Sequence, residues 1–221
     1  MSVGIYILLF CSMFAVSTSP LIARYLNHLD PIAIAFWRMM IGSIIMHTFS
    51  VFYKGKKTLS KKNSILTVSA GILLGLHFAL FYSSISLLPN NIVNATVFGT
   101  LAPLFALIIE IYFGRKIKMN LVLGLIIVLT GSFIMFISDF SFDSHLMQGN
   151  LLAVTCSICF AIVFIISDKV RKEESAVNFS KFLFTYATLI LFIISIILDI
   201  NLFSFSNHDF WYLLFLGVVP T

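Results

Sequence analysis

The chain has 221 residues, of which 60% are hydrophobic and 10% are charged, and its formal net charge is +5. A soluble domain has about 45–50% apolar and about 25% charged residues, so this chain has too few polar side chains to cover a surface in water. The composition excludes a soluble protein and predicts a polytopic membrane protein. The positive charge does not indicate nucleic acid, because the basic residues lie in short loops between apolar runs.

Eight apolar segments follow one another along the chain, and most approach the length of about 20 residues that spans a bilayer. Each is expected to be a helix, because every backbone group in lipid must find a partner within its own segment. The first lacks a preceding basic residue and is expected to be retained rather than cleaved as a signal peptide. The segments are Val3–Ala23, Pro31–Phe52, Ser64–Leu88, Ile92–Phe113, Leu121–Ile137, Asn150–Ile166, Phe179–Leu198 and Phe210–Pro220.

The distribution of basic residues predicts the orientation. Of 14 Lys and Arg residues, five lie in Lys54–Lys62, three in Arg115–Lys118 and four in Lys169–Lys181. These ranges follow the second, fourth and sixth segments, whereas the loops after the third, fifth and seventh contain none. Short basic loops stay on the cytoplasmic side, so the N-terminus is expected in the cytoplasm, with the chain in a bacterial-type inner membrane.

The three cysteines, Cys11, Cys156 and Cys159, all lie inside apolar segments. The spacing of Cys156 and Cys159 is that of a metal or redox pair, but no second pair and no histidine lies near them, so both are interpreted as packing residues. No cofactor and no metal site is predicted. No catalytic residue is predicted either, because HExxH, paired aspartates within a segment and a nucleophile elbow are all missing from the sequence. A membrane-embedded enzyme is therefore the less favoured alternative.

A weak internal repeat relates the two ends of the chain. The sequence GIYILLFCSMFA from Gly4 resembles GNLLAVTCSICFA from Gly149, and an offset of 145 residues aligns Cys11 with Cys156. Five segments separate the two starts. An odd number inverts the second copy relative to the first, an arrangement found in many secondary transporters.

Several stretches resemble the EamA-type modules of the drug/metabolite transporter superfamily. The sequence GLHFALFYSSISLLPNNIVNATVFGTLAPLFALI, Gly75–Ile109, resembles the third and fourth helices of such a module. AFWRMMIGS, which contains Arg38, resembles the second helix, and GNLLAVTCSICFAIVFIISDKVRK resembles the start of the second module. Tyr186 lies where the second module often has a tyrosine. The family often has a glutamate after the glycine that ends helix four, whereas here Arg115 follows Gly114.

The resemblance implies an all-α transmembrane bundle with inverted 5 + 5 repeats, of which about 7.5–8 helices would be present because the chain stops at Thr221. Residues 1–138 would form the first five-helix module and residues 149–221 an incomplete second one. It also implies a secondary transporter of small metabolites that works by alternating access. The alternative is a truncated product that inserts but does not transport. The expected partners are a small-molecule substrate of unknown identity and the lipid bilayer; a homo-oligomer is left open.

Polar side chains inside the apolar segments are the candidates for a substrate pathway. Arg38 is predicted either to face a cavity, where it would bind a substrate anion or a helix carboxylate, or to extend outward to the interface. His77 is predicted either to face the cavity, where it would relay a proton or hold a substrate hydroxyl, or to be a hydrogen-bonded core residue. Ser84 lies seven residues further on, so it and the nearby Tyr82 are predicted to share the side of the helix that carries His77. Tyr186 is a candidate only through the resemblance.

The fourth segment is predicted to be the best wall for the pathway. Asn94 lies near its start. Pro103 is expected to bend the helix, and the bend either frees a backbone carbonyl for a ligand or Thr100 or is purely structural. Glu110 either pairs with Arg115 or Lys116 at the interface or exchanges a proton on the pathway. One helix face is predicted to carry the polar stripe Thr96, Thr100, Pro103, Leu107 and Glu110, whose spacings are four, three, four and three residues.

Overall fold

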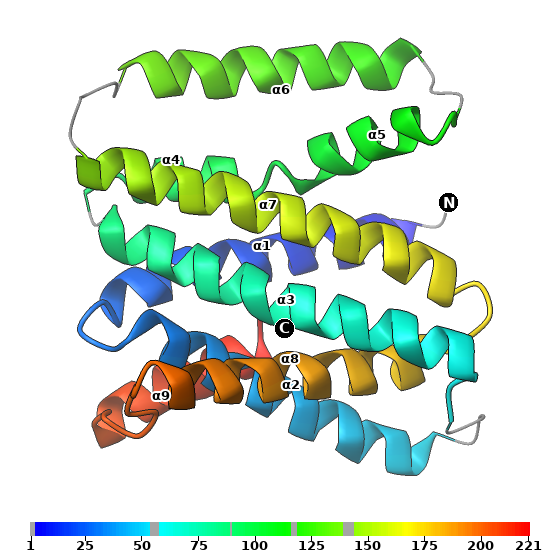
Figure 1. Ribbon diagram of the computed structural model, residues 1–221, viewed down its shortest axis with the longest axis vertical. Coiled ribbons are helices and arrows are strands. Elements are labelled where there is room, and N and C mark those ends of the chain that lie inside the picture. The colour runs from blue at the N-terminus through cyan, green and yellow to red at the C-terminus, as the bar shows by residue number, and fades with distance from the viewer. Residues whose placement is uncertain (1–2, 54–57, 89, 116–118, 139–143) are drawn as a thin grey trace.

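The computed structural model describes residues 3–53, 58–88, 90–115, 119–138 and 144–221. Within these ranges every regular element is a helix (Figure 1). The helices are α1 (Val3–Tyr25), α2 (Pro31–Phe52), α3 (Lys61–Leu87), α4 (Ile92–Gly99), α5 (Ala102–Tyr112), α6 (Met119–Ser138), α7 (Ser144–Val170), α8 (Ala176–Ile197) and α9 (Asn207–Val218). Six spans are long and apolar enough to cross a membrane, with α4 and α5 counted as one span. The predicted all-α, multi-pass membrane bundle is confirmed.

Local capping explains where several helices start. The Asp30 carboxylate accepts a hydrogen bond from the backbone N–H of Ile32 at 2.8 Å, and Pro31 occupies the first helical position. Ser60 and Ser175 cap α3 and α8 in the same way. A serine or aspartate that accepts from an unpaired N–H fixes a helix start, and proline at the first position costs no hydrogen bond. The loops between spans are therefore set by short sequence signals.

The helices of the two halves run in opposite directions. In Figure 1, α1 begins at the right edge and α7 at the left edge, and α2 with α8 and α3 with α9 are reversed in the same way. These are the pairs that the 145-residue offset aligns. α2, α5 and α7 end, and α3 and α8 begin, at the edge where α1 starts. This edge is called the basic end, because Lys61, Arg115, Lys169, Arg171 and Lys172 lie there.

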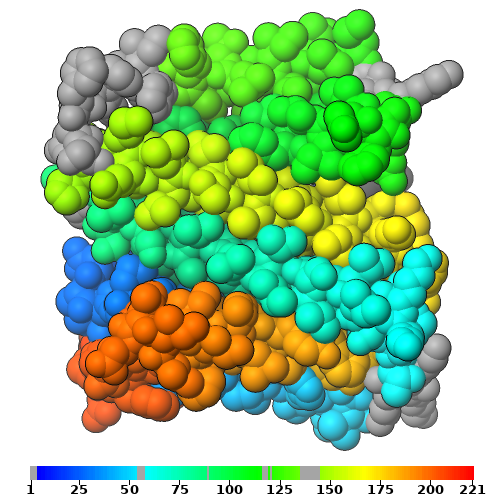
Figure 2. Space-filling model, in the orientation of Figure 1, coloured from blue at the N-terminus to red at the C-terminus, as the bar shows by residue number. Residues whose placement is uncertain are grey.

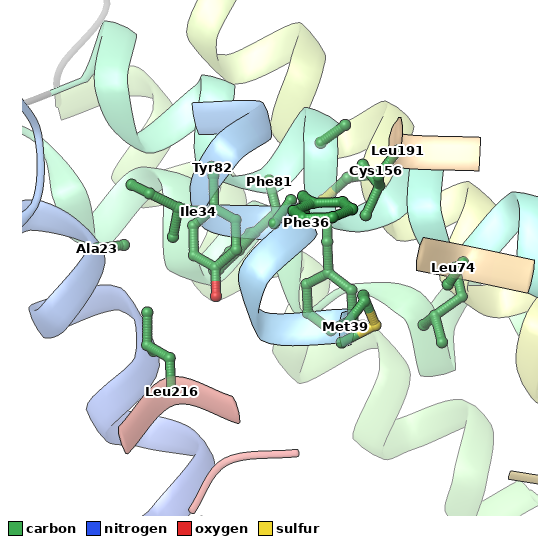
Figure 3. Close-up of a cluster of buried hydrophobic side chains, with 14 of the residues drawn as sticks. Ala23, Ile34, Phe36, Met39, Leu74, Phe81, Tyr82, Cys156, Leu191 and Leu216 are labelled. Atoms are coloured by element: carbon green, nitrogen blue, oxygen red, sulfur yellow. The ribbon is translucent and has the colours of Figure 1, made fainter. Parts of the chain in front are cut away.

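Helix α3 lies at the centre, packed against α7 on one side and α8 on the other, and Figure 2 shows the three as successive layers of one face. Gly71 and Gly75 bring the backbones of α3 and α8 together: a Cβ atom on Gly71 would lie 2.9 Å from the carbonyl oxygen of Leu183. Small residues permit this approach between membrane helices. Figure 3 shows part of the buried core, with Met39 of α2 near Leu74 of α3.

The outer helices expose apolar side chains, as expected for contact with lipid. Leu8, Phe10 and Phe14 of α1 are each about 70% exposed, at 71%, 72% and 69%. Leu121 and Ile127 of α6 are also exposed. Helical segments whose backbone groups are paired internally can present such surfaces to hydrocarbon.

The fourth predicted segment needs a correction. It is not one bent helix: α4 ends at Gly99 and α5 begins at Ala102. Pro103 has no N–H to donate to Gly99 four residues earlier, and its ring clashes with that carbonyl, so helical hydrogen bonding is interrupted there. Gly99 also packs directly on Phe81 of α3, since a Cβ atom would meet the ring at 2.8 Å. The prediction of a bend understated the effect of the proline.

Candidate functional site

A cavity of about 680 Å³ lies inside the bundle, between α1, α2, α3, the α4–α5 break, α7 and α8. Ligand cavities in proteins are commonly about 300–1,000 Å³. Most of the lining is apolar, and six of its side chains are phenylalanines: Phe78, Phe81, Phe160, Phe164, Phe179 and Phe184. The cavity is therefore large enough for a small organic molecule and has walls suited to an apolar one.

Arg38 is the charged group in the depth of this cavity. On α2 it shares a buried face with Ala35, Met39 and Gly42, at helical spacings that direct it toward the bundle interior. The side chain is only 4% exposed. The alternative in which it extends outward to the interface is wrong.

The Arg38 guanidinium is held by neutral oxygens. Nη1 donates to the Ser19 hydroxyl at 2.7 Å and to the Tyr82 hydroxyl at 2.8 Å. Nη2 donates to the Pro220 carbonyl at 2.7 Å, and Nε donates to the Thr221 hydroxyl at 3.1 Å. Cζ lies 4.3 Å from the ring centre of Phe78, a cation–π distance. Within the described part of the chain, no carboxylate lies within 4.0 Å of it, so the predicted pairing with a helix carboxylate is not present.

His77, in α3, lines the cavity and also forms a hydrogen bond with a neighbouring helix. Its Nδ1 is 2.9 Å from the carbonyl oxygen of Cys156 in α7. Its ring stacks on Phe160, with ring centres 4.4 Å apart. The hydrogen bond expected of a core histidine is therefore present, and one face of the residue still borders the cavity. A substrate role for His77 stays a prediction.

The α4–α5 break supplies another part of the cavity wall. Thr96, Thr100 and Pro103 line the cavity together. The Thr96 hydroxyl donates to the Ile92 carbonyl at 2.8 Å and that of Thr100 to the Val97 carbonyl at 3.0 Å. Both hydroxyls keep acceptor capacity toward the cavity while their protons serve their own helix.

The family comparison matches most of the chain. The model of the EamA-like transporter family matches residues 3–137 and 147–221. The chain belongs to the EamA-like transporter family. This membership indicates a membrane transporter rather than an enzyme, and the suspected resemblance is confirmed. No curated protein and no solved structure shows a significant match to the chain.

Five of the sequence-predicted pathway residues of this EamA-like chain lie outside the cavity lining: Tyr82, Ser84, Asn94, Glu110 and Tyr186. Tyr82 is linked to the cavity through its hydrogen bond with Arg38. On α3 the lining ends at Phe81, so Ser84, almost one turn further, is fully buried between packed helices. Asn94 is buried in α4, on a different face from Thr96. Tyr186 packs its Cβ atom against Gly71 of α3, so it lies at the contact between α3 and α8 and not in the cavity lining.

Glu110 does not continue the polar stripe. The break at Thr100 and Leu101 interrupts the helical phase, so Leu107 and Glu110 no longer follow Thr96 around one face. Glu110 instead forms an ion pair with Arg115, beside a separate hollow of about 350 Å³ that Asp168 and Lys172 also line. Glu110 therefore has the ion pair with Arg115 that the interfacial alternative predicted.

Sequence reasoning missed Ser19, Thr221 and Arg171, which all line the cavity. Ser19 lies among Ser12, Ser17 and Thr18 in an apolar segment, and no periodic pattern distinguishes it from them. Arg171 was counted only as a loop residue that sets topology. One sequence feature could have indicated Ser19: it directly precedes Pro20, which lies inside α1.

At the end of the bundle opposite the basic end, α2 contacts the α8–α9 connection and the α1–α2 connection contacts α9. The Trp37 Nε1–H donates to the Leu202 carbonyl at 2.7 Å. His28 Nε2 lies 3.2 Å from a carboxylate oxygen of Asp209. The backbone N–H of Ser206, with smaller contributions from its hydroxyl and from His28, holds the pKa of Asp209 below its usual value. Among the described residues, the cavity lining includes none from these connections, but it reaches Arg171 and Ser180 at the basic end.

Proposed function

We propose that this EamA-like chain is a secondary transporter that moves a small organic solute by alternating access, with the Arg38 cavity as its binding site. The cavity itself is the observation that carries the proposal. It lies between helices of both inverted halves, and its lining extends to the basic end and not to the end that Trp37 and Leu202 close. A binding site at the interface of inverted repeats, open to one side, is what alternating access requires.

We further propose that the basic end is cytoplasmic, so that the structure is open inward. Lys61, Arg115, Lys169 and Lys172 gather at this end, and basic residues next to short loops are retained on the cytoplasmic side. The N-terminal end of α1 lies at the same edge (Figure 1). A bacterial-type inner membrane fits this arrangement.

Five of the sequence candidates are assigned to the solute path under this proposal: Arg38, His77, Thr96, Thr100 and Pro103. Tyr82 is a positioning residue, because its hydroxyl holds the Arg38 guanidinium. Ser84, Asn94, Glu110 and Tyr186 receive no place on the path.

The proposal is tested by measuring from which side of the membrane a cysteine in the cavity can be modified. This measurement needs no knowledge of the substrate. Single cysteines are introduced after Cys11, Cys156 and Cys159 are replaced by alanine. Thr96→Cys is exposed to a membrane-impermeant maleimide added to intact cells, and separately to inside-out vesicles. Alternating access predicts modification from both sides, and faster modification from the cytoplasmic side because that end is open.

Thr155→Cys is the matched control, because the Thr155 hydroxyl also donates to its own helix, to the Leu151 carbonyl at 2.8 Å, but it is exposed away from the cavity. It should react from neither side. Lys61→Cys should react only in inside-out vesicles and Asn201→Cys only in intact cells, which tests the orientation. If Thr96→Cys reacts from one side alone, the alternating-access proposal is wrong whatever the orientation.

A further inference from the structure

The charged side chains on the described cavity wall are all of one sign. Among its described lining residues, Arg38 and Arg171 are cationic and none is aspartate or glutamate. Arg38 lies in the depth of the cavity and is nearly fully buried, whereas Arg171 is exposed where the lining reaches the basic end. A solute that enters from that end therefore meets two positive charges in succession.

The partners of Arg38 leave its charge uncompensated. An arginine guanidinium stays protonated in proteins and offers five N–H donors. Four of these are used, and each acceptor is an uncharged hydroxyl or carbonyl oxygen. A buried cation is unfavourable unless an opposite charge accompanies it, and an arginine binds a carboxylate through two parallel hydrogen bonds. The site is therefore complementary to an anionic group that supplies the missing charge.

The rest of the wall constrains the remainder of the solute. Phe78 lies against the guanidinium, and Phe160, stacked on His77, continues the aromatic surface along the cavity. An ammonium group placed there would have no aspartate or glutamate side chain of the described lining to pair with, and burial of an unpaired charge is costly. Cations and zwitterions are disfavoured for the same reason.

We infer that the solute is an apolar organic monoanion, an acid whose carboxylate pairs with Arg38 and whose hydrocarbon or aromatic body lies among the phenylalanines. This inference rests on the proposed function, because it identifies the chemical class bound at the same cavity. It separates this chain from a carrier of amino acids or of cationic compounds.

Four probes that share a benzyl group test the inference: phenylacetate, phenylacetamide, phenylethylamine and phenylalanine. The purified full chain in mild detergent at neutral pH is titrated with each, and affinity is obtained from the shift of its thermal unfolding midpoint. Phenylacetate is expected to bind about tenfold more tightly than phenylacetamide, which corresponds to the added strength of charge-assisted hydrogen bonds. Phenylethylamine and phenylalanine are expected to bind more weakly than the amide. Acetate, which lacks the ring, is the control for a nonspecific effect of the anion.

Arg38→Gln retains hydrogen-bond donors without the charge, and it should bind acid and amide with similar affinity. Arg38→Lys should keep the preference for the acid. Arg171→Gln, at the mouth, is the matched control and should keep the order of the four probes. A residue that only holds the helices together would lower stability without changing the ratio of acid to amide.

Equal or tighter binding of the amide, the amine or phenylalanine by the unaltered chain overturns the inference without any variant. The absence of a shift with phenylacetate overturns it too, as does an unchanged acid preference in Arg38→Gln. These outcomes are independent of the proposed function, which fails only if Thr96→Cys is modified from one side. A chain that passes the cysteine test but prefers the amine is an alternating-access carrier of another solute class.

Discussion

Replacing Gly71 with alanine is expected to destabilise the protein, although alanine is the better helix former. Gly71 lies where α3 crosses α8, and an added Cβ atom would meet the Tyr186 Cβ at 2.5 Å, the Leu183 carbonyl oxygen at 2.9 Å and the Ala187 backbone nitrogen at 3.3 Å. Two of these neighbours are backbone atoms, which cannot rotate away. The helices themselves must separate.

The magnitude follows from the distance. Carbon atoms in contact normally lie about 3.5–4.0 Å apart, so the two helices must move by roughly 1 Å at this point. Overpacking of this kind typically costs about 1–3 kcal/mol. Alanine is more favourable than glycine inside a helix by about 1 kcal/mol, which offsets part of this loss of stability. The net expectation is a loss of about 1 kcal/mol for Gly71→Ala. Replacing Gly75 as well should cost less than twice that, because both added Cβ atoms meet Ala187 and one separation of the helices relieves both.

The measurement is the unfolding free energy of the purified chain in mild detergent, compared with that of Gly124→Ala. Gly124 lies in α6, and no atom lies within 4 Å of the position that its Cβ atom would occupy. That control should gain stability or stay unchanged, so the two substitutions are expected to have opposite signs. An equal gain at Gly71 and Gly124 would refute the close contact of α3 with α8.

Three further predictions concern the ends of the bundle. Glu110→Gln should change the unfolding free energy by less than about 1 kcal/mol, because its ion pair is partly exposed; a larger loss would mean a deeper role. Because folding lowers the pKa of Asp209, its contribution to stability is complete above the usual value of 3.8 and is lost as the pH falls toward the folded value. In Asp209→Asn, the fall of the unfolding midpoint on acidification from about pH 5 to pH 3 should be shallower, and an unchanged slope would contradict this. Trp37→Phe removes the hydrogen bond to Leu202 and should speed the maleimide modification of Thr96→Cys in intact cells. An unchanged rate would show that this contact does not close the outer end.

The sequence allowed the helices to be predicted because lipid leaves the backbone few alternatives. Apolar length, capping residues such as Asp30 and the basic loops act locally, and each is visible in a short stretch of chain. The inward position of Arg38 could also be predicted as one of two alternatives, because a charge inside an apolar segment needs either a cavity or an interface.

The surroundings of the candidate site could not be predicted, because they depend on contacts between distant residues. Arg38 is hydrogen-bonded to Pro220 and Thr221, which lie 182 and 183 residues away in the chain. The helical period placed Glu110 with Thr96 only while the fourth segment was assumed to be continuous. Once the helix breaks before Pro103, residues beyond the break lose that phase, and periodicity carries no information across it.

Helix α2 links the cavity to the end of the bundle opposite the basic end. Trp37 and Arg38 are successive residues of α2: the indole bonds the α8–α9 connection, while the guanidinium points into the cavity and bonds Pro220, just after α9. An anion that binds Arg38 competes with Pro220 for its N–H donors, because described residues already accept from four of the five. Release of Pro220 removes one contact between α2 and the residues just after α9, and the first turn of α9 carries Asp209, which contacts His28. Under the proposed function, a solute that replaces Pro220 on Arg38 thus removes a contact of α2 that the empty cavity retains, which is the kind of differential interaction that a ligand needs to shift a conformational equilibrium.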